Sequence, residues 1–259
     1  MKKRNYYQVQ VQSSQRLTPT MQRLVFQGED LQRFPHDTPA GSYIKLLFNQ
    51  YGESFTDAPA ENETVLMRTY TVRHADAKTG TLTVDFMLHG EGVESGPASH
   101  WAVNAKPGDT LYFGGPGTSK GLADERDWVL LMGDMTALPA ISAQLENLPA
   151  DTKGYAVISI EDADDKQALT HPDNVDIIWV ENAGSDTLAS SLAAIRWLDG
   201  TPAVWAACEF SSMRAIRSAL DEQFDIPRSQ VYVTSYWRKG RSEDQHKIDK
   251  REDLAQYNG

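Results

Sequence analysis

The sequence predicts a β + α/β protein, in which an antiparallel six-stranded β-barrel precedes a doubly wound parallel sheet of the nucleotide-binding type. Three observations support this fold class. Short segments of the first half alternate apolar and polar residues, as half-buried strands do. Near Asp127 the pattern changes to near-continuous apolar runs, which are typical of strands covered on both faces. Helical segments then alternate with these runs, as in a parallel doubly wound sheet.

The predicted barrel occupies the first part of the chain. Turn residues at Asp37–Gly41, Ala75–Gly80 and Lys106–Asp109 separate several of its segments. Since no convincing long helical pattern interrupts most of them, a small antiparallel barrel is favoured. The six strands are expected near residues 6–17, 20–29, 41–49, 65–75, 80–90 and 109–117.

The second half predicts a sheet with helices between its strands. Strands are expected near residues 127–135, 154–161, 175–181, 203–210 and 230–237, and helices near 136–148, 187–198 and 211–224. A boundary at about Lys120 to Asp127 gives a barrel domain over residues 1–122 and an α/β domain over 123–240. The strongly charged residues 241–259 form either a surface helix or a disordered tail.

Composition excludes several functions. A chain of 259 residues can bury a sizeable core. The single cysteine, Cys208, rules out an internal disulfide and a cysteine-based metal cluster, and it fits a reducing cytoplasm. The net charge of −11 argues against nucleic acid as the main partner. Because the chain has neither a long apolar run nor an apolar signal core, we expect a cytoplasmic protein without membrane insertion.

The segment MRTYTVR, from Met67 to Arg73, carries unusual chemistry for a strand. Two arginines flank a Thr-Tyr-Thr core. An exposed strand with a solvated basic face is the simple structural explanation. A flavin dinucleotide would use the same residues: Arg68 supplies a cation for the pyrophosphate, Tyr70 covers the isoalloxazine, and Thr71 provides a short polar partner for N5 and O4. Arg68 and Tyr70 would share one face of the strand.

A second segment, HGEGVESGPASHW, follows the next predicted strand. Its glycine-rich and proline-containing loop, with Ser99, can offer backbone N–H groups to a phosphate. His89 could donate to the same phosphates or to a ribose. The histidines have no spacing that matches a set of paired metal ligands, so no metal site is predicted.

Four motifs in order resemble the siderophore-interacting protein family: Arg-x-Tyr-Thr, the His-Gly…Gly-Pro-Ala-Ser-x-Trp loop, GDMTALPAI and YWRKG. The resemblance runs from about Tyr6 to Gly240. It implies a ferric-siderophore reductase with FAD as its cofactor and a ferredoxin-reductase-like fold. The FAD would carry the redox chemistry, so no catalytic side chain is expected. The contacts to FAD that the resemblance implies are Arg68, Thr69, Tyr70, Thr71, Val72, Asp85, Phe86, His89, Pro97, Ala98, Ser99, Asp134, Thr136 and Trp237.

For two of these residues an ordinary structural explanation competes with the functional one. Asp134 and Thr136 follow a predicted strand and precede a predicted helix. Thr136 is a plausible N-cap of that helix, and Pro139 is tolerated in a first turn.

The resemblance implies a ferric siderophore, a catecholate or a hydroxamate, as the substrate. Lys45 is the leading candidate contact because it interrupts an apolar strand, although it also fits the solvent face of a half-buried strand. Many relatives have an arginine where this chain has Gly117, and Lys120 is the candidate substitute. A surface charge run is the alternative explanation for the remaining candidates. The full set of cations is Lys45, Lys120, Arg238, Lys239, Arg241 and Lys247.

The electron donor is either NAD(P)H or a ferredoxin-type protein. Many nicotinamide-using relatives have Gly-Glu where this chain has Cys208-Glu209, and the acidic residues 161–165 disfavour a 2′-phosphate. Against this, Arg214 and Arg217 share a helix face and could hold a nucleotide phosphate. The balance favours a ferredoxin-type donor. Two alternative functions stay open: a general NAD(P)H–flavin or ferredoxin reductase without a siderophore site, and a non-enzymatic siderophore-binding protein.

Overall fold

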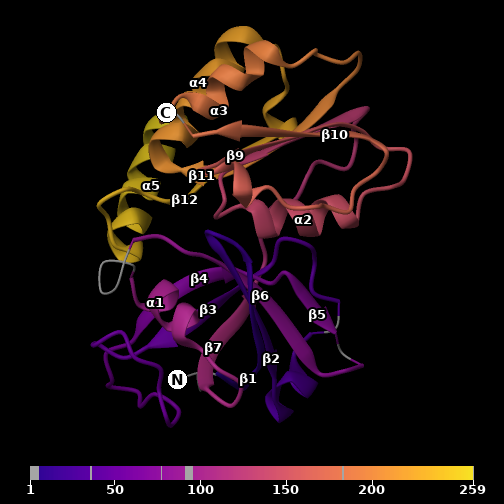
Figure 1. Ribbon diagram of the computed structural model, residues 1–259. Helices are drawn as coiled ribbons and strands as arrows, with labels where there is room; N and C mark the ends of the chain where they lie inside the picture. Colours follow the sequence, from indigo (N-terminus) through magenta and orange to yellow (C-terminus); the bar gives the residue numbers. More distant parts are fainter. Residues whose placement is uncertain (1–5, 36, 77, 91–95, 183, 259) are drawn as a thin grey trace. The chain divides into compact units, whose positions relative to one another are not determined.

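The computed structural model describes residues 6–35, 37–76, 78–90, 96–182 and 184–258 (Figure 1). The chain divides into two compact units, of which the first ends at Ser119 and the second begins at Lys120. The charged C-terminal segment from residue 241 belongs to the second unit. No helix in the described part of the chain is long and apolar enough to cross a membrane.

The N-terminal unit is built on one antiparallel sheet with the strand order β4-β3-β7-β1-β2-β6-β5. Each strand pairs with its neighbours in an antiparallel register. The strands are β1 Tyr7–Thr18, β2 Met21–Gln27, β3 Tyr43–Phe48, β4 Leu66–Thr71, β5 His74–Asp76, β6 Thr81–Met87 and β7 Thr110–Gly117.

The sheet has seven strands, so the expected number of six was wrong. The segment predicted as one strand, residues 65–75, is divided into β4 and β5, which lie at opposite ends of the strand order. Val72 N donates to Ser42 O at 2.8 Å, next to β3, whereas Arg73 N donates to Thr83 O of β6 at 3.0 Å. The chain therefore changes its hydrogen-bonding partner between these two residues. This change connects the two ends of the sheet around a shared apolar core.

A short helix, α1 (Pro97–Asn104), covers part of that core, although a loop was expected around Ser99. Ala98 and Ala102 are buried in the core, and the Trp101 ring stacks on Phe26 with centroids 6.3 Å apart. Apolar residues at positions i, i+3 and i+4 thus give the helix one buried face. A proline at the first helical position has a backbone angle that suits a helix start. In the sequence this proline was interpreted as part of a loop, so the short helix was not predicted.

The C-terminal unit contains a parallel five-stranded sheet with the order β10-β9-β8-β11-β12. As predicted, strands and helices alternate, and α3 and α4 lie on one face of this sheet with α2 on the other (Figure 1). The strands are β8 Trp128–Gly133, β9 Lys153–Ile160, β10 Asn174–Glu181, β11 Pro202–Glu209 and β12 Val231–Trp237. The helices are α2 Leu138–Glu146, α3 Thr187–Ser191, α4 Phe210–Gln223 and α5 Glu243–Asn258.

Gly133, the last residue of β8, allows α2 to pack closely on the sheet. A Cβ atom at this position would lie 2.7 Å from Ala137 Cβ and 2.8 Å from the Ala207 carbonyl oxygen. Both distances are shorter than ordinary van der Waals contacts, so only glycine fits without a shift of the backbone. The chain therefore turns tightly after β8, directly before Asp134.

Two helices differ from the expected pattern. The helix predicted over residues 187–198 ends early, because α3 is followed by a 3-10 helix at Leu192–Ala194 and by the extended residue Ile195. The Trp197 ring then stacks on Phe224 with centroids 3.7 Å apart. This aromatic packing replaces the last helical turn. The charged C-terminal segment, left open between helix and tail, forms the 16-residue helix α5.

Candidate functional site

Strand β4 carries candidate residues on both of its faces. Arg68 and Tyr70 pair across the sheet with Leu46 and Ile44, which are fully buried in the core. They therefore face the inner side of the sheet. Thr69 faces the other side, where its hydroxyl accepts a hydrogen bond from Lys45 Nζ at 2.9 Å. One strand thus borders two different environments.

Arg68 is a half-buried cation. Its guanidinium donates to the Met67 carbonyl oxygen at 2.8 Å, and no carboxylate among the described residues pairs with it. A partly buried guanidinium without a carboxylate partner is suited to an anionic ligand such as a phosphate. The role predicted for Arg68, a contact to the pyrophosphate, stays a prediction.

Tyr70 offers a flat, supported aromatic ring. Its ring centroid lies 4.5 Å from that of Phe86, which is fully buried, and the two planes are inclined by 37°. The core thus supports one side of the half-buried Tyr70 ring. Thr71 and Val72, the next two residues, are buried. The Tyr70 ring on Phe86 and the backbone hydrogen bond from Val72 N to Ser42 O therefore both hold this segment in place.

Asp85 has internal partners for its carboxylate. Arg23 Nε and Nη2 lie 2.6 and 2.7 Å from its two oxygens, and Arg73 Nε lies 3.9 Å away. The bidentate pair crosses from β2 to β6 and satisfies most of the acceptor capacity of this buried carboxylate. Among the predicted cofactor contacts, Asp85 is therefore engaged chiefly with arginines.

The start of α1 presents backbone donors. Gly96 precedes the helix with φ of +73°, Pro97 occupies the first turn, and Ser99 is buried. N–H groups in the first turn of a helix lack partners within the helix, and they favour an anion. The Ser99 hydroxyl accepts a long hydrogen bond from His89 N at 3.4 Å. Residues 91–95 of the predicted phosphate loop lie outside the described residues.

His89 lies beside this helix start. A Cβ atom at Gly96 would lie 3.7 Å from its Cε1 atom. Burial of part of the ring lowers the pKa of His89 from its ordinary value, even though the side chain as a whole is exposed. The neutral imidazole is therefore the dominant form near pH 7, and it can both donate and accept.

These features of the N-terminal unit fit a flavin dinucleotide. Arg68 and the first turn of α1 suit the charge of a pyrophosphate, whereas the Tyr70 ring suits a flat tricyclic system. The donor set contains cations, backbone N–H groups and one aromatic surface, which is the chemistry that FAD requires. The residues present therefore fit FAD.

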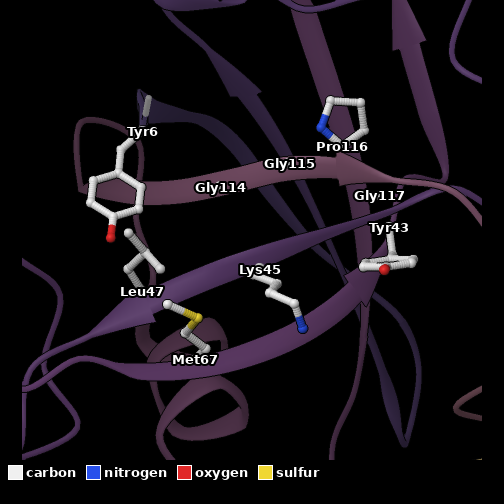
Figure 2. A pocket seen from close by; sticks show the side chains of 9 residues that line it. All are labelled: Tyr6, Tyr43, Lys45, Leu47, Met67, Gly114, Gly115, Pro116 and Gly117. Atoms are coloured by element: carbon white, nitrogen blue, oxygen red, sulfur yellow. The ribbon is translucent and has the colours of Figure 1, made fainter. Parts of the chain in front are cut away.

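A pocket opens on the other face of the same sheet (Figure 2). It has a volume of about 250 Å³. The Lys45 ammonium extends between the two tyrosines at its ends, and lies 5.6 Å from the centroid of the Tyr43 ring. An apolar floor with one central cation suits a flat or partly apolar anion. The lining residues are Tyr6, Tyr43, Lys45, Leu47, Met67, Gly114, Gly115, Pro116 and Gly117.

Gly117 is in close contact with Tyr43. A Cβ atom at Gly117 would lie 2.3 Å from Tyr43 Cζ, so the Tyr43 ring occupies the space that a larger side chain would need. Lys120, the candidate substitute for an arginine here, belongs to the C-terminal unit and is not among the described residues that line the pocket. Its ammonium lies 6.0 Å from the centroid of the Tyr232 ring in that unit.

A second group of candidate residues lies at the carboxyl ends of β8, β11 and β12. Asp134 Oδ1 accepts from Thr136 N at 2.9 Å and from Thr136 Oγ1 at 2.5 Å. Asp134 Oδ2 accepts from Glu209 N and Trp237 Nε1, each at 2.9 Å. Burial raises the pKa of Asp134 from its ordinary value, while the hydrogen bonds from Thr136, Trp237 and Glu209 act in the opposite direction.

Thr136 does not cap α2, so that structural explanation was wrong. The helix starts at Leu138 with Ala137 as its N-cap, and Pro139 lies in its first turn as expected. The Thr136 hydroxyl is used by Asp134 instead. Sequence reasoning also did not assign Glu209 to the site. A glutamate at the end of a strand, directly before a helix that begins with serines, is the signal that could have indicated its capping role.

Most of the predicted C-terminal cations are paired within their own unit. Arg238 and Arg241 both contact Asp249 Oδ2, at 2.8 and 3.2 Å. Lys247 pairs with the first turn of α5, at 3.0 Å from Glu243 and 3.2 Å from Asp244. Acids of α5 thus compensate these three charges.

Lys239 differs from its neighbours. Its backbone N donates to Glu209 Oε1 at 3.2 Å, and its side chain is exposed. Over the described ranges, no carboxylate pairs with its ammonium. Of the cations predicted near the end of β12, Lys239 is therefore the one whose ammonium no described carboxylate compensates.

Helix α5 also engages the arginines proposed for a nucleotide phosphate. Arg217 Nη1 lies 2.7 Å from Asp253 Oδ2, and its guanidinium carbon lies 4.1 Å from the centroid of the Tyr257 ring. Arg214 Nε lies 3.4 Å from the same carboxylate. The Arg217 side chain is only 11% exposed, so α5 rather than solvent surrounds it.

The fold and the flavin-compatible residues together define a class of protein. The ferredoxin-NADP+ reductase of Plasmodium falciparum has the same fold, with a TM-score of 0.66 at 12% identity over 90% of this chain and 97% of its own. An antiparallel sheet followed by a parallel doubly wound sheet is the fold of this reductase, and the chain has this ferredoxin-reductase-like fold.

Closer relatives define the family. Residues 10–120 match the family of siderophore-interacting FAD-binding domains. Residues 126–240 match the siderophore-interacting protein family. The ferric vibriobactin reductase ViuB of Vibrio cholerae is 34% identical over 86% of this chain and 85% of its own length. The siderophore-interacting protein SipS from Aeromonas hydrophila superposes with a TM-score of 0.85 at 28% identity, over 97% of this chain and 99% of SipS.

The chain belongs to the siderophore-interacting protein family. Its N-terminal unit carries the FAD-binding domain of that family, and FAD is its cofactor.

Proposed function

We propose that the protein is a ferric-siderophore reductase that uses FAD to add one electron to the iron of a bound chelate. The observation that carries this proposal is the two-sided arrangement of β4. Arg68 and Tyr70 face the side that fits FAD, whereas Thr69 holds Lys45 beside the pocket on the other side. A cofactor segment and an anion-binding pocket thus share one strand. The name of the Vibrio cholerae relative, ferric vibriobactin reductase, supports the same reaction.

The cofactor residues have distinct roles in this proposal. Arg68 and the N–H groups of Ala98 and Ser99 hold the pyrophosphate, while Tyr70 covers the flavin ring. Thr71 pairs with Tyr43 and shares the strand face of Thr69, so its side chain is not assigned to the flavin. When bound, FAD supplies the one-electron chemistry that converts Fe(III) to Fe(II). The protein holds and orients the two reactants and provides no covalent catalyst.

The Lys45 pocket receives part of the chelate. Its volume of about 250 Å³ is small for a complete siderophore, so one metal-binding arm enters it. The ammonium of Lys45 attracts the anionic oxygens of a catecholate or hydroxamate arm, while Leu47 and Met67 contact its apolar part. Reduction makes the chelate more negative by one charge, so this cation stabilises the product more than the substrate. Fe(II) binds hard oxygen ligands less tightly than Fe(III), which favours release.

The same proposal extends to the C-terminal unit. Lys239 is the cation that we retain there as a chelate contact, because α5 compensates Arg238, Arg241 and Lys247. The engagement of Arg214 and Arg217 by Asp253 removes a binding site for a nucleotide phosphate, which favours a ferredoxin-type donor over NAD(P)H. We place this reaction in the cytoplasm, where the reducing conditions suit the buried thiol of Cys208.

A single-turnover experiment tests the reaction. The FAD-loaded protein is reduced with dithionite under anaerobic conditions and mixed with a ferric tris-catecholate or a ferric tris-hydroxamate. Flavin reoxidation and Fe(II) captured by a colorimetric chelator are followed together. We expect one Fe(II) for each electron lost from the flavin. A protein that binds the chelate without losing electrons from the flavin would instead be a siderophore carrier.

A charge reversal separates a siderophore reductase from a general flavin reductase. Lys45→Glu should weaken the apparent affinity for the ferric chelate by about tenfold or more. Lys106→Glu, a matched change at an exposed lysine of the same unit, should leave it unchanged. Equal chelate affinities in both variants would indicate a general reductase without a siderophore site. Parallel reduction of the oxidised flavin by NADH, NADPH and reduced ferredoxin identifies the donor.

A further inference from the structure

Three neighbouring strand ends meet at one edge of the parallel sheet. β8, β11 and β12 are adjacent and parallel, so their carboxyl ends lie together. Asp134 follows β8 directly, while Glu209 and Trp237 are the last residues of β11 and β12. Cys208 pairs with Ser235, but Glu209 pairs with Trp237, so β12 has one additional residue at this point. Such a bulge redirects the side chains that follow it.

Groups at this edge of the sheet occupy the hydrogen-bond acceptor positions of the Asp134 carboxylate. Each of its two oxygens accepts two hydrogen bonds, from Thr136 on one side and from Glu209 N and Trp237 Nε1 on the other. An ionised carboxylate has about four acceptor positions, so little capacity is left for a ligand. Asp134 is thus occupied by the protein itself.

Glu209 continues the connection to the end of β12. Its Oε2 caps α4 by accepting from Ser211 N and Ser212 N, and its Oε1 accepts from Lys239 N at 3.2 Å. Since Asp134 holds the backbone of Glu209, both acids constrain the same exposed turn, residues 237–239.

Trp237 is exposed although its N–H group is held. Its relative exposure is 39%, which is unusual for a large aromatic side chain. Its indole N–H donates to Asp134, so the orientation of the ring is defined while one part of its surface stays accessible. The exposed side chain of Lys239 lies two residues further along the chain.

We infer that Asp134 is a positioning residue that holds the indole of Trp237 directly and the backbone of Lys239 through Glu209, rather than a residue that contacts FAD or the chelate. The expectation from sequence was a direct contact between Asp134 and the flavin. The inference rests on the proposed function only where it assigns residues 237–239 to ligand binding. The tether itself can be measured without any ligand.

The first test measures the tether in the FAD-loaded protein without substrate. Indole N–H signals of the 15N-labelled protein are recorded, and Trp237→Phe identifies the signal of Trp237. In Asp134→Ala, both carboxylate oxygens are removed, so all four donors, including the Trp237 indole N–H, lose their acceptor. We expect exchange of the Trp237 indole N–H with solvent to accelerate by roughly tenfold. An unchanged exchange rate would overturn the inference.

The second test is a double-mutant cycle on the apparent affinity for ferric tris-catecholate in single turnovers. Trp237→Phe keeps an aromatic ring but removes the indole donor, so it breaks the same tether from the other end. Each single variant should weaken chelate affinity by roughly tenfold, and the double variant should be no weaker than either. Additive effects would mean that Asp134 acts independently of Trp237, against the inference.

A matched variant controls for general damage to the sheet. Asp127 precedes β8 at its opposite end, and its Oδ2 accepts from Thr201 N at 2.7 Å. Asp127→Asn should change neither indole exchange nor chelate affinity. If Asp134→Ala does not fold, Trp237→Phe alone decides. A chelate affinity of Trp237→Phe that is as unchanged as that of Asp127→Asn would then overturn the inference. If the wild-type protein transfers no electron to the chelate, the proposed function fails, while the exchange measurement still decides on the tether.

Discussion

His246 Nε2 lies 2.8 Å from the hydroxyl oxygen of Ser235, and both side chains are buried. This hydrogen bond joins α5 to β12. Lys250 Nζ donates to the Ser235 carbonyl oxygen at 3.1 Å and reinforces the same junction. Burial, followed by the charge of Lys250, lowers the pKa of His246, whereas the carboxylates of Asp249 and Glu243 act in the opposite direction and Arg238 adds to the lowering.

This junction predicts an acid-sensitive stability. The pKa of His246 in the folded protein lies below its ordinary value of 6.5, so the unfolded chain binds more protons in the interval between the two values. The stabilising effect of the neutral ring is present above this interval and is lost as the pH falls through it. The free energy of unfolding, measured with urea, should decrease as the pH falls below about 6.5. This residue should contribute at most about 1.4 kcal/mol per pH unit to the decrease.

Replacement of the histidine checks the assignment. His246→Gln keeps a polar side chain but removes the titration, so it should flatten this part of the pH profile. His100→Gln, at an exposed position of α1, should leave the profile unchanged. An identical pH dependence in wild type and His246→Gln would show that other groups cause it.

Arg68→Ala should weaken the binding of FAD. A charge-assisted hydrogen bond to phosphate contributes about 1.5–3 kcal/mol, which corresponds to a loss of roughly 10- to 100-fold in affinity. Titration of the apoprotein with FAD measures the effect. Arg16→Ala is the matched control, because this exposed arginine also donates to a backbone carbonyl, at 3.0 Å from Pro19 O. Equal FAD affinities in the two variants would argue against a phosphate contact from Arg68.

Gly117→Ala should disturb the Lys45 pocket. The added Cβ atom would overlap the Tyr43 ring, which must then move relative to Lys45. We expect the apparent affinity for the ferric chelate to change by several-fold, while the affinity for FAD, which we propose to bind on the other face, stays the same. Gly121→Ala adds the same methyl group where nothing lies within 4 Å and should have no effect. Unchanged chelate affinity in Gly117→Ala would place the substrate elsewhere.

Gly133→Ala should destabilise the C-terminal unit. The new methyl group would meet Ala137 Cβ and the Ala207 carbonyl oxygen at less than 3 Å, and a backbone atom cannot rotate away. Overpacking of this kind costs about 1–3 kcal/mol. Thermal and urea unfolding measure the loss, with Gly121→Ala as the reference. A stability equal to that of the reference would mean that α2 shifts freely on the sheet.

Periodicity in the sequence predicted the parallel sheet well, because its three central strands, β9, β8 and β11, are buried apolar runs. It failed where a pattern continues across a change of partner. The alternation through Thr71, Val72 and Arg73 is unbroken, yet the hydrogen bonds pass from the β3 side to β6. Helix α1 was missed because a proline and glycines surround its short span.

The candidate site shows a similar division. The shared face of Arg68 and Tyr70 was predictable, because residues two positions apart in a strand point to the same side of the sheet. The pairing of Arg238 and Arg241 with Asp249 was not, since the partners are separated by 11 and 8 residues, a spacing that no local pattern reports. The link from Asp134 to Trp237 spans 103 positions and depends on the order of the strands in the sheet.

The alternating faces of β4 also limit how this chain can change in length. Insertion or deletion of a single residue between Arg68 and Tyr70 would rotate one of them to the pocket side and bring Thr69 or its replacement to the side that we propose for the flavin. Substitutions can tune either face separately, but a one-residue length change would impair both at once. Homologues should therefore vary in side chains along this strand while keeping its residue count.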